Sequence, residues 1–235
     1  ALDRFTMFDS IREYAAEKLA QNTPATRLRA AAHYAILGGT AFIDETFGPN
    51  APAAYARLGY AFENCLLAVE TGVSQGRADL AAHCALAVGH LAAKTGPFSR
   101  AIELTTEVLA VTTDPRLEVR LLNQLALFFH RTGRLDEAMG CYANAIATVR
   151  ALDEPALEGM LRVGYANVQF DRSQVADAEA NYRTALELYQ RSGPVHAEAS
   201  ALNSLALLFR RLGQIDEAVQ AHAQALRIFE DIQFP

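Results

Sequence analysis

The segment FFHRTGRLDEAMGCYANAI, residues 128–146, holds side chains of the types that catalyse reactions. They are an imidazole, a guanidinium, two carboxylates, a thiol and a phenol, at His130, Arg131, Asp136, Glu137, Cys141 and Tyr142. A thiolate beside a base can act as a nucleophile, and an imidazole or a carboxylate can transfer protons. Such chemistry requires the side chains to meet. The secondary structure that carries them therefore shows whether they form an active site or support the fold.

The same segment is part of a repeat. LNQLALFFHRTGRLDEAMGCYANAI, RVGYANVQFDRSQVADAEANYRTAL and LNSLALLFRRLGQIDEAVQAHAQAL begin 40 residues apart, at Leu122, Arg162 and Leu202, and align without gaps. Small residues recur in register at Ala126, Ala166 and Ala206, at Ala138, Ala178 and Ala218, and at Ala145, Ala185 and Ala225. Each copy predicts two amphipathic helices, at about 116–131 and 135–151 in the first copy. Gly133, Ser173 and Gly213 stand at the turn, where a left-handed residue commonly ends a helix.

This spacing of small residues, with an aromatic between the last two, resembles the tetratricopeptide repeat. Tyr142 and Tyr182 occupy the aromatic position, while His222 departs from it. A weaker copy lies at 85–109, where Thr105 replaces the aromatic. The resemblance implies an all-α fold, a right-handed α-solenoid of helical hairpins over residues 76–235. The hairpins are predicted at 77–113, 116–152, 156–192 and 196–232.

The first 75 residues resemble a different region. RFTMFDSIREYAAEKLA, residues 4–20, resembles the end of the winged-helix region of bacterial STAND-type regulators, which are signal-transduction ATPases with numerous domains. LRAAAHYAILGGTAF (28–42) and YARLGYAFENCLLAVETGV (55–73) resemble the two helices that follow in that family. We therefore expect residues 1–22 to be the winged-helix tail and its linker, and residues 23–75 to be a helical lead-in pair.

The resemblance also implies a longer parent protein. The sequence begins with Ala and ends directly after a helical segment, and we expect it to be a fragment. It contains no GxxxxGK[ST] loop, so we expect no cofactor here and ATP only in an upstream domain.

The repeat changes the interpretation of the reactive residues. Asp136 and Glu137 recur as Asp216 and Glu217 in the first turn of a helix, where acidic groups complement the helix dipole. Tyr142 falls at a packing position, and Cys141 has no counterpart in the other copies and no paired base. His83 and His90 lack further ligands at metal-binding spacing. We therefore expect neither a catalytic residue nor a metal site, and we expect no enzyme.

Composition narrows the function classes. The sequence is 51% hydrophobic and carries a formal net charge of −6, with no basic tail, so we expect no contact with nucleic acid. Its 3 cysteines form no CxxC pair, which is typical of reduced thiols. No apolar run reaches the length of a membrane span, so we expect no membrane contact and a cytoplasmic location.

The sharper hypothesis concerns the concave face, which the first helix of each hairpin lines in a solenoid. The inward positions are predicted to be His90, Lys94, Arg120, Asn123, Leu127, His130, Arg131, Asn167, Asp171, Asn203, Leu207, Arg210 and Arg211. This set holds several bases and one acid, which could attract an acidic peptide, another protein, a small anionic effector or another domain of the parent chain. The alternative is a solvated face on which arginine stems cover apolar surface.

The last helix predicts a further contact. Val219, Leu226, Ile228 and Phe229 have no following helix to cover them. Natural solenoids end in a polar cap, so we expect more repeats in the parent chain or self-association through this face.

These observations favour a non-catalytic sensor or oligomerisation module of a STAND-type regulator, which binds a protein or an effector. Two main alternatives stay open: a constitutive adaptor or scaffold, and the regulatory tail of a kinase or cyclase. An enzyme would return as a third only with a conserved polar cluster away from the packing positions.

Overall fold

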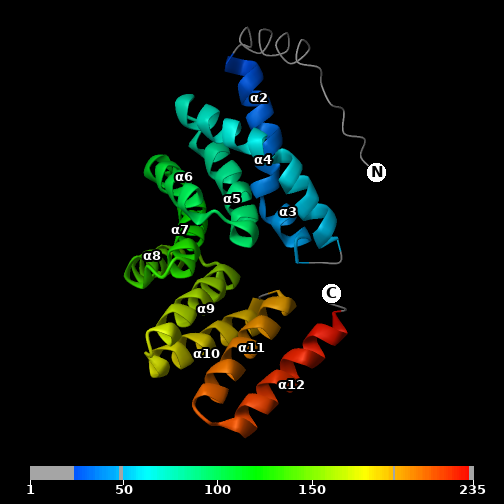
Figure 1. Ribbon diagram of the computed structural model, residues 1–235, viewed down its shortest axis with the longest axis vertical. Helices are drawn as coiled ribbons and strands as arrows, with labels where there is room; N and C mark the ends of the chain where they lie inside the picture. The colour runs from blue at the N-terminus through cyan, green and yellow to red at the C-terminus, as the bar shows by residue number, and fades with distance from the viewer. Residues whose placement is uncertain (1–23, 48–49, 193, 233–235) are drawn as a thin grey trace.

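The protein is described by a computed structural model that covers residues 24–47, 50–192 and 194–232. Every regular element in these ranges is helical, which confirms the predicted all-α class (Figure 1). The predicted winged-helix tail, residues 1–22, lies outside the described residues.

Four helical hairpins make up the larger part of the fold. They are α5 (Ala78–Thr95) with α6 (Phe98–Val111), α7 (Pro115–Arg131) with α8 (Leu135–Val149), α9 (Pro155–Asp171) with α10 (Val175–Ser192), and α11 (Val195–Arg211) with α12 (Ile215–Asp231). Each hairpin stacks on the next, and the stack curves into a solenoid (Figure 1).

Local sequence explains where the helices of the second hairpin begin and end. The Asp114 side chain accepts hydrogen bonds from the backbone N–H groups of Arg116 and Leu117 and so caps α7, with Pro115 in the first turn. The residues predicted for the turns do adopt left-handed backbone, with φ of 77° at Gly133, 62° at Ser173 and 76° at Gly213. The repeat therefore keeps one turn geometry even where serine replaces glycine.

The core confirms the predicted packing positions. The recurring alanines of the repeat are all buried, and Tyr142 and Tyr182 are buried with them. Small residues at these points allow the helices to approach closely, and the tyrosines fill the space between hairpins. Tyr142, which could have been an active-site phenol, is thus part of the core.

At two successive hairpin interfaces, a large residue on one side is matched by a small residue on the other. A Cβ on Gly164 would lie 2.4 Å from the Tyr142 hydroxyl oxygen, so the large tyrosine needs a glycine opposite it. The preceding interface has Thr105 in place of the tyrosine and Gln124 in place of the glycine. The buried Gln124 amide fills that space and donates hydrogen bonds to the Thr105 hydroxyl (3.0 Å) and the Ala85 carbonyl (3.1 Å).

The N-terminal unit differs from the prediction. The sequence predicted one helix over residues 28–42, but the chain forms α2 (Pro24–Ala35), the 3₁₀ turn η1 (Ile36–Gly38) and α3 (Thr40–Glu45). The cause is a close approach to α5, because a Cβ on Gly38 would lie 1.7 Å from the His83 carbonyl oxygen. The next helix, α4 (Ala51–Ser74), packs against both α2 and α5 and so joins this unit to the solenoid.

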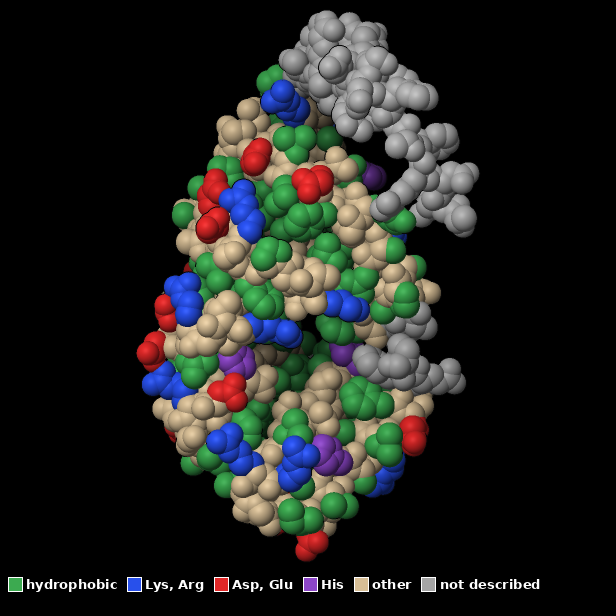
Figure 2. All heavy atoms as spheres, in the orientation of Figure 1, with side chains coloured by type: hydrophobic (Ala, Val, Ile, Leu, Met, Phe, Trp, Pro, Cys, Tyr) green, Lys and Arg blue, Asp and Glu red, His purple; other side chains and the backbone are tan. Residues whose placement is uncertain are grey.

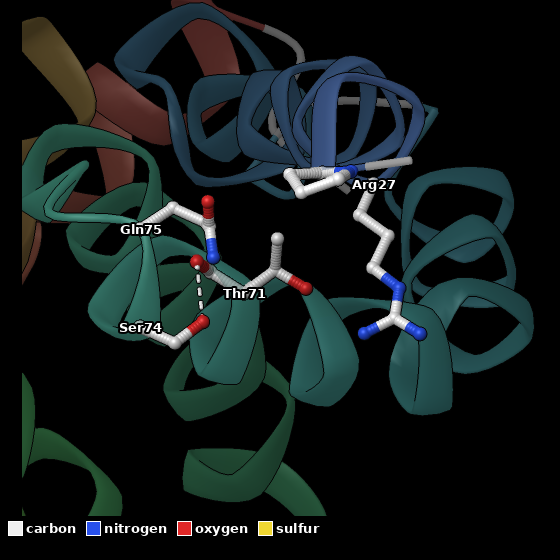
Figure 3. A pocket seen from close by; sticks show the side chains of 5 residues that line it. Arg27, Thr71, Ser74 and Gln75 are labelled. Carbon is white, nitrogen blue, oxygen red and sulfur yellow. Dashed lines mark hydrogen bonds between the residues drawn. The ribbon is translucent and has the colours of Figure 1, made fainter. Parts of the chain in front are cut away.

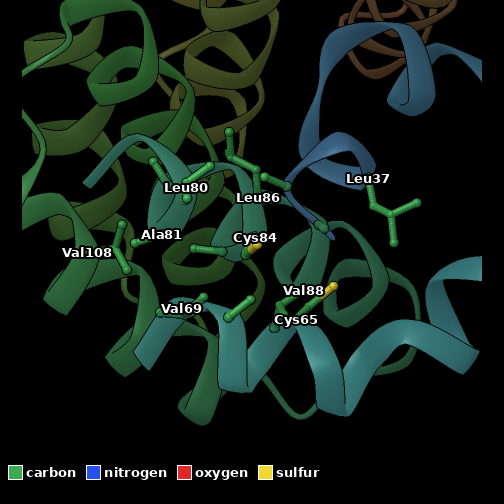
Figure 4. Close-up of a cluster of buried hydrophobic side chains, with 14 of the residues drawn as sticks. Leu37, Cys65, Val69, Leu80, Ala81, Cys84, Leu86, Val88 and Val108 are labelled. Atoms are coloured by element: carbon green, nitrogen blue, oxygen red, sulfur yellow. The ribbon is translucent and has the colours of Figure 1, made fainter. Parts of the chain in front are cut away.

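The last helix confirms the predicted exposed face only in part. Val219 and Leu226 are 60% and 57% exposed. Ile228 and Phe229 were also predicted to be uncovered, but they are half-buried against the core of the last two hairpins. The prediction was wrong for these two residues because their side chains pack against the hydrophobic core formed by their own hairpin and the one before it. A separate hydrophobic core, shown in Figure 4, joins η1, α4, α5 and α6.

Candidate binding groove

The inner face of the solenoid is the candidate site. The first helices of the hairpins, α5, α7, α9 and α11, lie on the inner side of the curve, and α6, α8, α10 and α12 lie outside them (Figure 1). Figure 2 shows a hollow in the middle of this view, with apolar side chains inside it and Lys, Arg and His side chains at its edge. We call this face the inner groove.

The N-terminal end of the inner groove holds a cluster of polar and charged side chains around one histidine. We define the His90 cluster as Thr46, Tyr55, His90, Lys94 and Arg120. The His90 Nε2 atom lies 2.8 Å from the Thr46 hydroxyl oxygen and 3.2 Å from the Tyr55 hydroxyl oxygen. The Lys94 ammonium lies 3.9 Å from the centroid of the Tyr55 ring, a cation–π contact.

The fifth member, Arg120, comes from the next hairpin and is half-buried. Its guanidinium donates a hydrogen bond of 3.0 Å to the Gly38 carbonyl of η1. The cluster thus joins the turn after α3 with α4, α5 and α7, and Arg120 links it to η1.

The charge states within the His90 cluster follow from its surroundings. Burial lowers the pKa of His90, and the nearby Arg120 and Lys94 charges lower it further. The imidazole is therefore neutral at pH 7. Burial also lowers the pKa of Arg120, and Asp44 and Glu154 oppose that shift, but the guanidinium remains charged.

An aromatic contact connects the two ends of the solenoid. The Phe47 ring, just after α3, stacks on the His196 ring at the start of α11, with centroids 5.5 Å apart and planes 16° apart. Phe47 also meets the edge of the His90 ring, at 5.9 Å. The inner groove is thus bounded at one point by a bridge between the first unit and the last hairpin.

The middle of the inner groove carries amides and a hydrogen-bonded His–Asp pair. His130 and Asp171 approach within 2.7 Å across α7 and α9. Asn167 accepts a hydrogen bond of 2.6 Å from the buried Tyr182 hydroxyl, so this amide supports the core. Asn123 makes a weak contact of 4.0 Å with the Met160 sulfur, and the neighbouring Leu127 is half-buried.

The C-terminal end is more open. Asn203, Leu207, Arg210 and Arg211 are all exposed, as is Arg131 at the end of α7. The Arg211 guanidinium lies 4.7 Å from the centroid of the Phe170 ring, so its stem covers apolar surface, as the alternative interpretation of the basic residues expects.

The structure therefore brings together only part of the predicted set. His90, Lys94 and Arg120 meet in one cluster, and His130 meets Asp171, whereas Arg210 and Arg211 belong to another hairpin. Sequence reasoning missed Thr46, Phe47, Tyr55, Met160 and His196. Met160 is the equivalent of Arg120 in the next repeat, so the repeat alignment could have identified it as an inward residue. Thr46, Phe47 and Tyr55 lie outside the repeat, so no alignment of repeats could identify them.

The reactive residues of the repeat do not form a catalytic arrangement. Burial raises the pKa of Cys141, and Arg134 lowers the pKa of Glu137 by hydrogen bonding to it. The Asp136 carboxylate forms an ion pair with Arg172 of the next hairpin. Among the described residues, no group of three or more His, Cys, Asp or Glu side chains could hold a metal ion.

Two shallow cavities lie away from the inner groove. The first, of about 150 Å³, is lined by Pro24, Arg27, Thr71, Ser74 and Gln75 (Figure 3), where the Ser74 hydroxyl donates to the Thr71 carbonyl. The second, of about 130 Å³, lies beside Arg150 and Glu158, which pair with each other. Neither contains a residue of the predicted set.

Comparison with known proteins identifies the repeats. Two tetratricopeptide-repeat family models match, one over residues 121–156 and the other over residues 157–231. Residues 121–231 contain tetratricopeptide repeats. Such repeats are generally non-catalytic protein-interaction modules, and their stacked hairpins form extended concave binding surfaces. A search of the curated proteins found no match.

Solved structures share the tetratricopeptide-like solenoid. RapI in its apo form is 10% identical, with 95% of this chain and 91% of that chain covered and a TM-score of 0.63. A Rap protein complexed with competence and sporulation factor is 16% identical, with 76% and 54% covered and a TM-score of 0.62. PlcR of Bacillus thuringiensis, in complex with the peptide PapR7 and DNA, is 14% identical, with 82% and 69% covered and a TM-score of 0.62. At sequence identities this low, the similarity shows a shared fold and no shared function.

No helix in the described part of the chain is both long and apolar enough to cross a membrane.

Proposed function

We propose that this chain is a non-catalytic sensor module that binds a peptide or an extended protein segment along the inner groove. The observation that carries the proposal is a row of amide and apolar side chains on the first helices, which have few partners within the chain. Asn203 is exposed, and no described residue forms a hydrogen bond with it. Asn123 has only its weak contact with the Met160 sulfur.

These side chains suit a peptide main chain. An asparagine amide both donates and accepts, so it can pair with the N–H and the C=O of one peptide unit. Met160 and Leu207, each 39% exposed, add apolar surface beside the amides. A bound segment would thus gain both hydrogen bonds and apolar burial in a groove that is already formed.

Similar solenoids support this choice of ligand. The Rap structure holds competence and sporulation factor, and the PlcR structure holds the peptide PapR7. We extend peptide binding to this chain on the basis of its own groove.

We further propose that the parent protein is a bacterial STAND-type regulator. The likeness of residues 4–20, 28–42 and 55–73 to that family supports this parent. A ligand that prefers one curvature of the solenoid, or that competes with a docked domain, would change the active fraction of the regulator. The adaptor and the kinase or cyclase tail remain the alternatives. An attached ATPase whose activity is independent of groove ligands would favour the adaptor.

The proposal is tested by selecting peptides from a displayed random library against this chain and measuring their affinities for groove variants. Asn123→Ala combined with Asn203→Ala removes two amide contacts, and the expected loss of affinity is about tenfold or more. Asn144→Ala, an exposed amide on the outer helix α8, is the matched control and should bind normally. Equal affinities of the double variant and the control would overturn the proposal.

A further inference from the structure

The His90 cluster has hydrogen-bond donors that the fold does not use. The Thr46 hydroxyl donates to the Ile43 carbonyl at 2.6 Å, so its oxygen can only accept from His90. The His90 Nε2 atom therefore carries the hydrogen and donates it. Tyr55 lies at the same nitrogen, so its oxygen also accepts, and its own hydroxyl hydrogen remains available to another acceptor.

Both cations of the cluster also lack a carboxylate partner. Most ion pairs of arginine in the described ranges have a nitrogen-to-oxygen distance of 2.6–3.5 Å, as in Arg162 with Glu158 and Arg116 with Glu154. Neither Lys94 nor Arg120 has a carboxylate oxygen within 4.0 Å among the described residues. Arg120 uses one of its five N–H donors on Gly38, although it is half-buried.

The unused donors of the cluster are accessible. No buried side-chain nitrogen or oxygen in the described ranges lacks a hydrogen-bond partner, so the Arg120 Nε and Nη1 atoms, which have no such partner, reach the surface. A guanidinium that is already partly desolvated loses little hydration when an anion binds, and a charge-assisted hydrogen bond is stronger than a neutral one. The cluster thus offers charged and neutral donors to a negatively charged oxygen.

The local charge favours a monoanion over a dianion. Asp44 and Glu154 act on Arg120 from nearby, and Glu154 is paired with Arg116 at 2.6 Å. Three cations (Lys94, Arg120 and Arg116) against these two carboxylates leave one net positive charge, because His90 is neutral. A carboxylate balances that charge, whereas a dianionic phosphate would exceed it.

We propose that the His90 cluster binds a carboxylate of the segment that occupies the inner groove, either the C-terminal carboxylate or an Asp or Glu side chain. This inference rests on the proposed function and deepens it. The charged anchor lies at the N-terminal end of the groove, and the amide and apolar surface of α7, α9 and α11 holds the rest of the segment. The equivalent of Arg120 in the next hairpin is Met160, so the repeat offers this anchor once.

The test is an NMR titration of the chain that follows the Arg120 Nε–Hε resonance. One probe, acetyl-tetraglutamate amide, carries only side-chain carboxylates. A second, acetyl-tetraalanine with a free C-terminus, carries only a terminal carboxylate. Acetyl-tetraglutamine amide is the neutral control, and inorganic phosphate is the dianion. The Arg120 resonance is expected to shift with at least one carboxylate peptide at millimolar concentration and not with tetraglutamine.

Variants then assign the effect to the cluster. Arg120→Met, which installs the side chain of position 160, and Lys94→Met should each weaken carboxylate binding about tenfold. Arg191→Met changes an exposed arginine on α10 and should leave binding unchanged. Lys94 is exposed, so Lys94→Met keeps the test valid if Arg120→Met does not fold. No shift with either carboxylate peptide, an equal shift with tetraglutamine, or tighter binding of phosphate would overturn the proposal.

Library-selected peptides separate this inference from the proposed function. If a peptide binds in the groove with an affinity that is unchanged after C-terminal amidation and after Asp and Glu are replaced by Asn and Gln, the carboxylate site is wrong and the groove stands. If carboxylate probes shift Arg120 but no selected peptide depends on Asn123 and Asn203, the proposed peptide groove is wrong instead.

Discussion

The N-terminal unit with α5 and the C-terminal hairpins α9–α12 build the same inner face in different ways. In the hairpins, residues 40 positions apart have the same environment, and Ile146 and Leu186 are each 9% exposed beneath the next hairpin. In the N-terminal unit, η1 with Gly38 separates α2 from α3, and the turn after α3 supplies Thr46 and Phe47 to the groove. The regular region supplies a uniform surface, and the irregular region supplies the polar cluster that marks one end of it.

The largest expected effect concerns the interruption at Gly38. Gly38→Ala should lower the free energy of unfolding by about 3 kcal/mol, because the new Cβ would overlap the His83 carbonyl oxygen and the backbone has no room to move. Gly59→Ala is the matched control, since nothing lies within 4 Å of its Cβ in α4. It should raise stability by about 0.5–1 kcal/mol. Urea denaturation measures both, and similar effects at the two glycines would contradict a close approach of η1 to α5.

The second prediction concerns a double substitution that gives the first hairpin interface the residue pair of the second. Thr105→Tyr alone should cost about 2–3 kcal/mol, because the buried Gln124 occupies the space that the ring needs. Adding Gln124→Gly recreates the pairing of Tyr142 with Gly164. The two changes should then be at least about 1 kcal/mol less destabilising together than the sum of the single effects. Additive effects would mean that the interfaces are not equivalent in space.

The third prediction concerns pH and the His90 cluster. The pKa of His90 is lower in the folded chain than its usual value of 6.5. As the pH falls, the unfolded chain therefore binds a proton at this histidine before the folded chain does. This group therefore costs no stability at pH 7.5 and destabilises the fold as the pH falls below 6.5. His90→Gln should show a smaller stability loss between pH 7.5 and pH 5 than the unchanged chain. His33→Gln, at an exposed histidine of α2, is the matched control, and identical profiles for His90→Gln and the unchanged chain would refute the argument.

The smallest expected effect concerns the bridge between the two regions. Phe47→Ala removes the stacking on His196 and should cost about 1 kcal/mol, since an aromatic pair contributes little beyond its buried area. The solenoid should open, and small-angle scattering should report a larger radius of gyration. Tyr60→Ala, at an exposed aromatic of α4, is the control. An unchanged radius would show that the bridge does not hold the curvature.

The repeat explains how much of the fold could be predicted from the sequence. The alanines, Tyr142, Tyr182 and the turn residues recur at a constant offset, and a recurring position has a recurring environment. Gly38 occurs once, so its contact with His83 left no pattern to recognise. The exchange of Tyr and Gly for Thr and Gln was visible as a departure from the repeat, but only the structure shows that the two departures compensate each other.

The candidate site, like the fold, was predictable where it lies in the repeat and not where it lies outside it. His90, Lys94 and Arg120 follow from the rule that the first helices face inward, although the sequence could not show that they meet. Thr46 and Tyr55 are brought to His90 by the broken helix and its loop, which no periodicity describes. The predicted excess of base along the groove is also uneven, because Asp171 pairs with His130 and Arg211 covers Phe170.

Mapping a library-selected peptide onto the chain by amide chemical shifts tests the central claim most directly. The account predicts that the perturbed resonances lie on α5, α7, α9 and α11 and include Asn123 and Asn203, while α6, α8 and α10 are unaffected. Perturbations centred on Val219 and Leu226 of α12, with the inner helices unchanged, would contradict it.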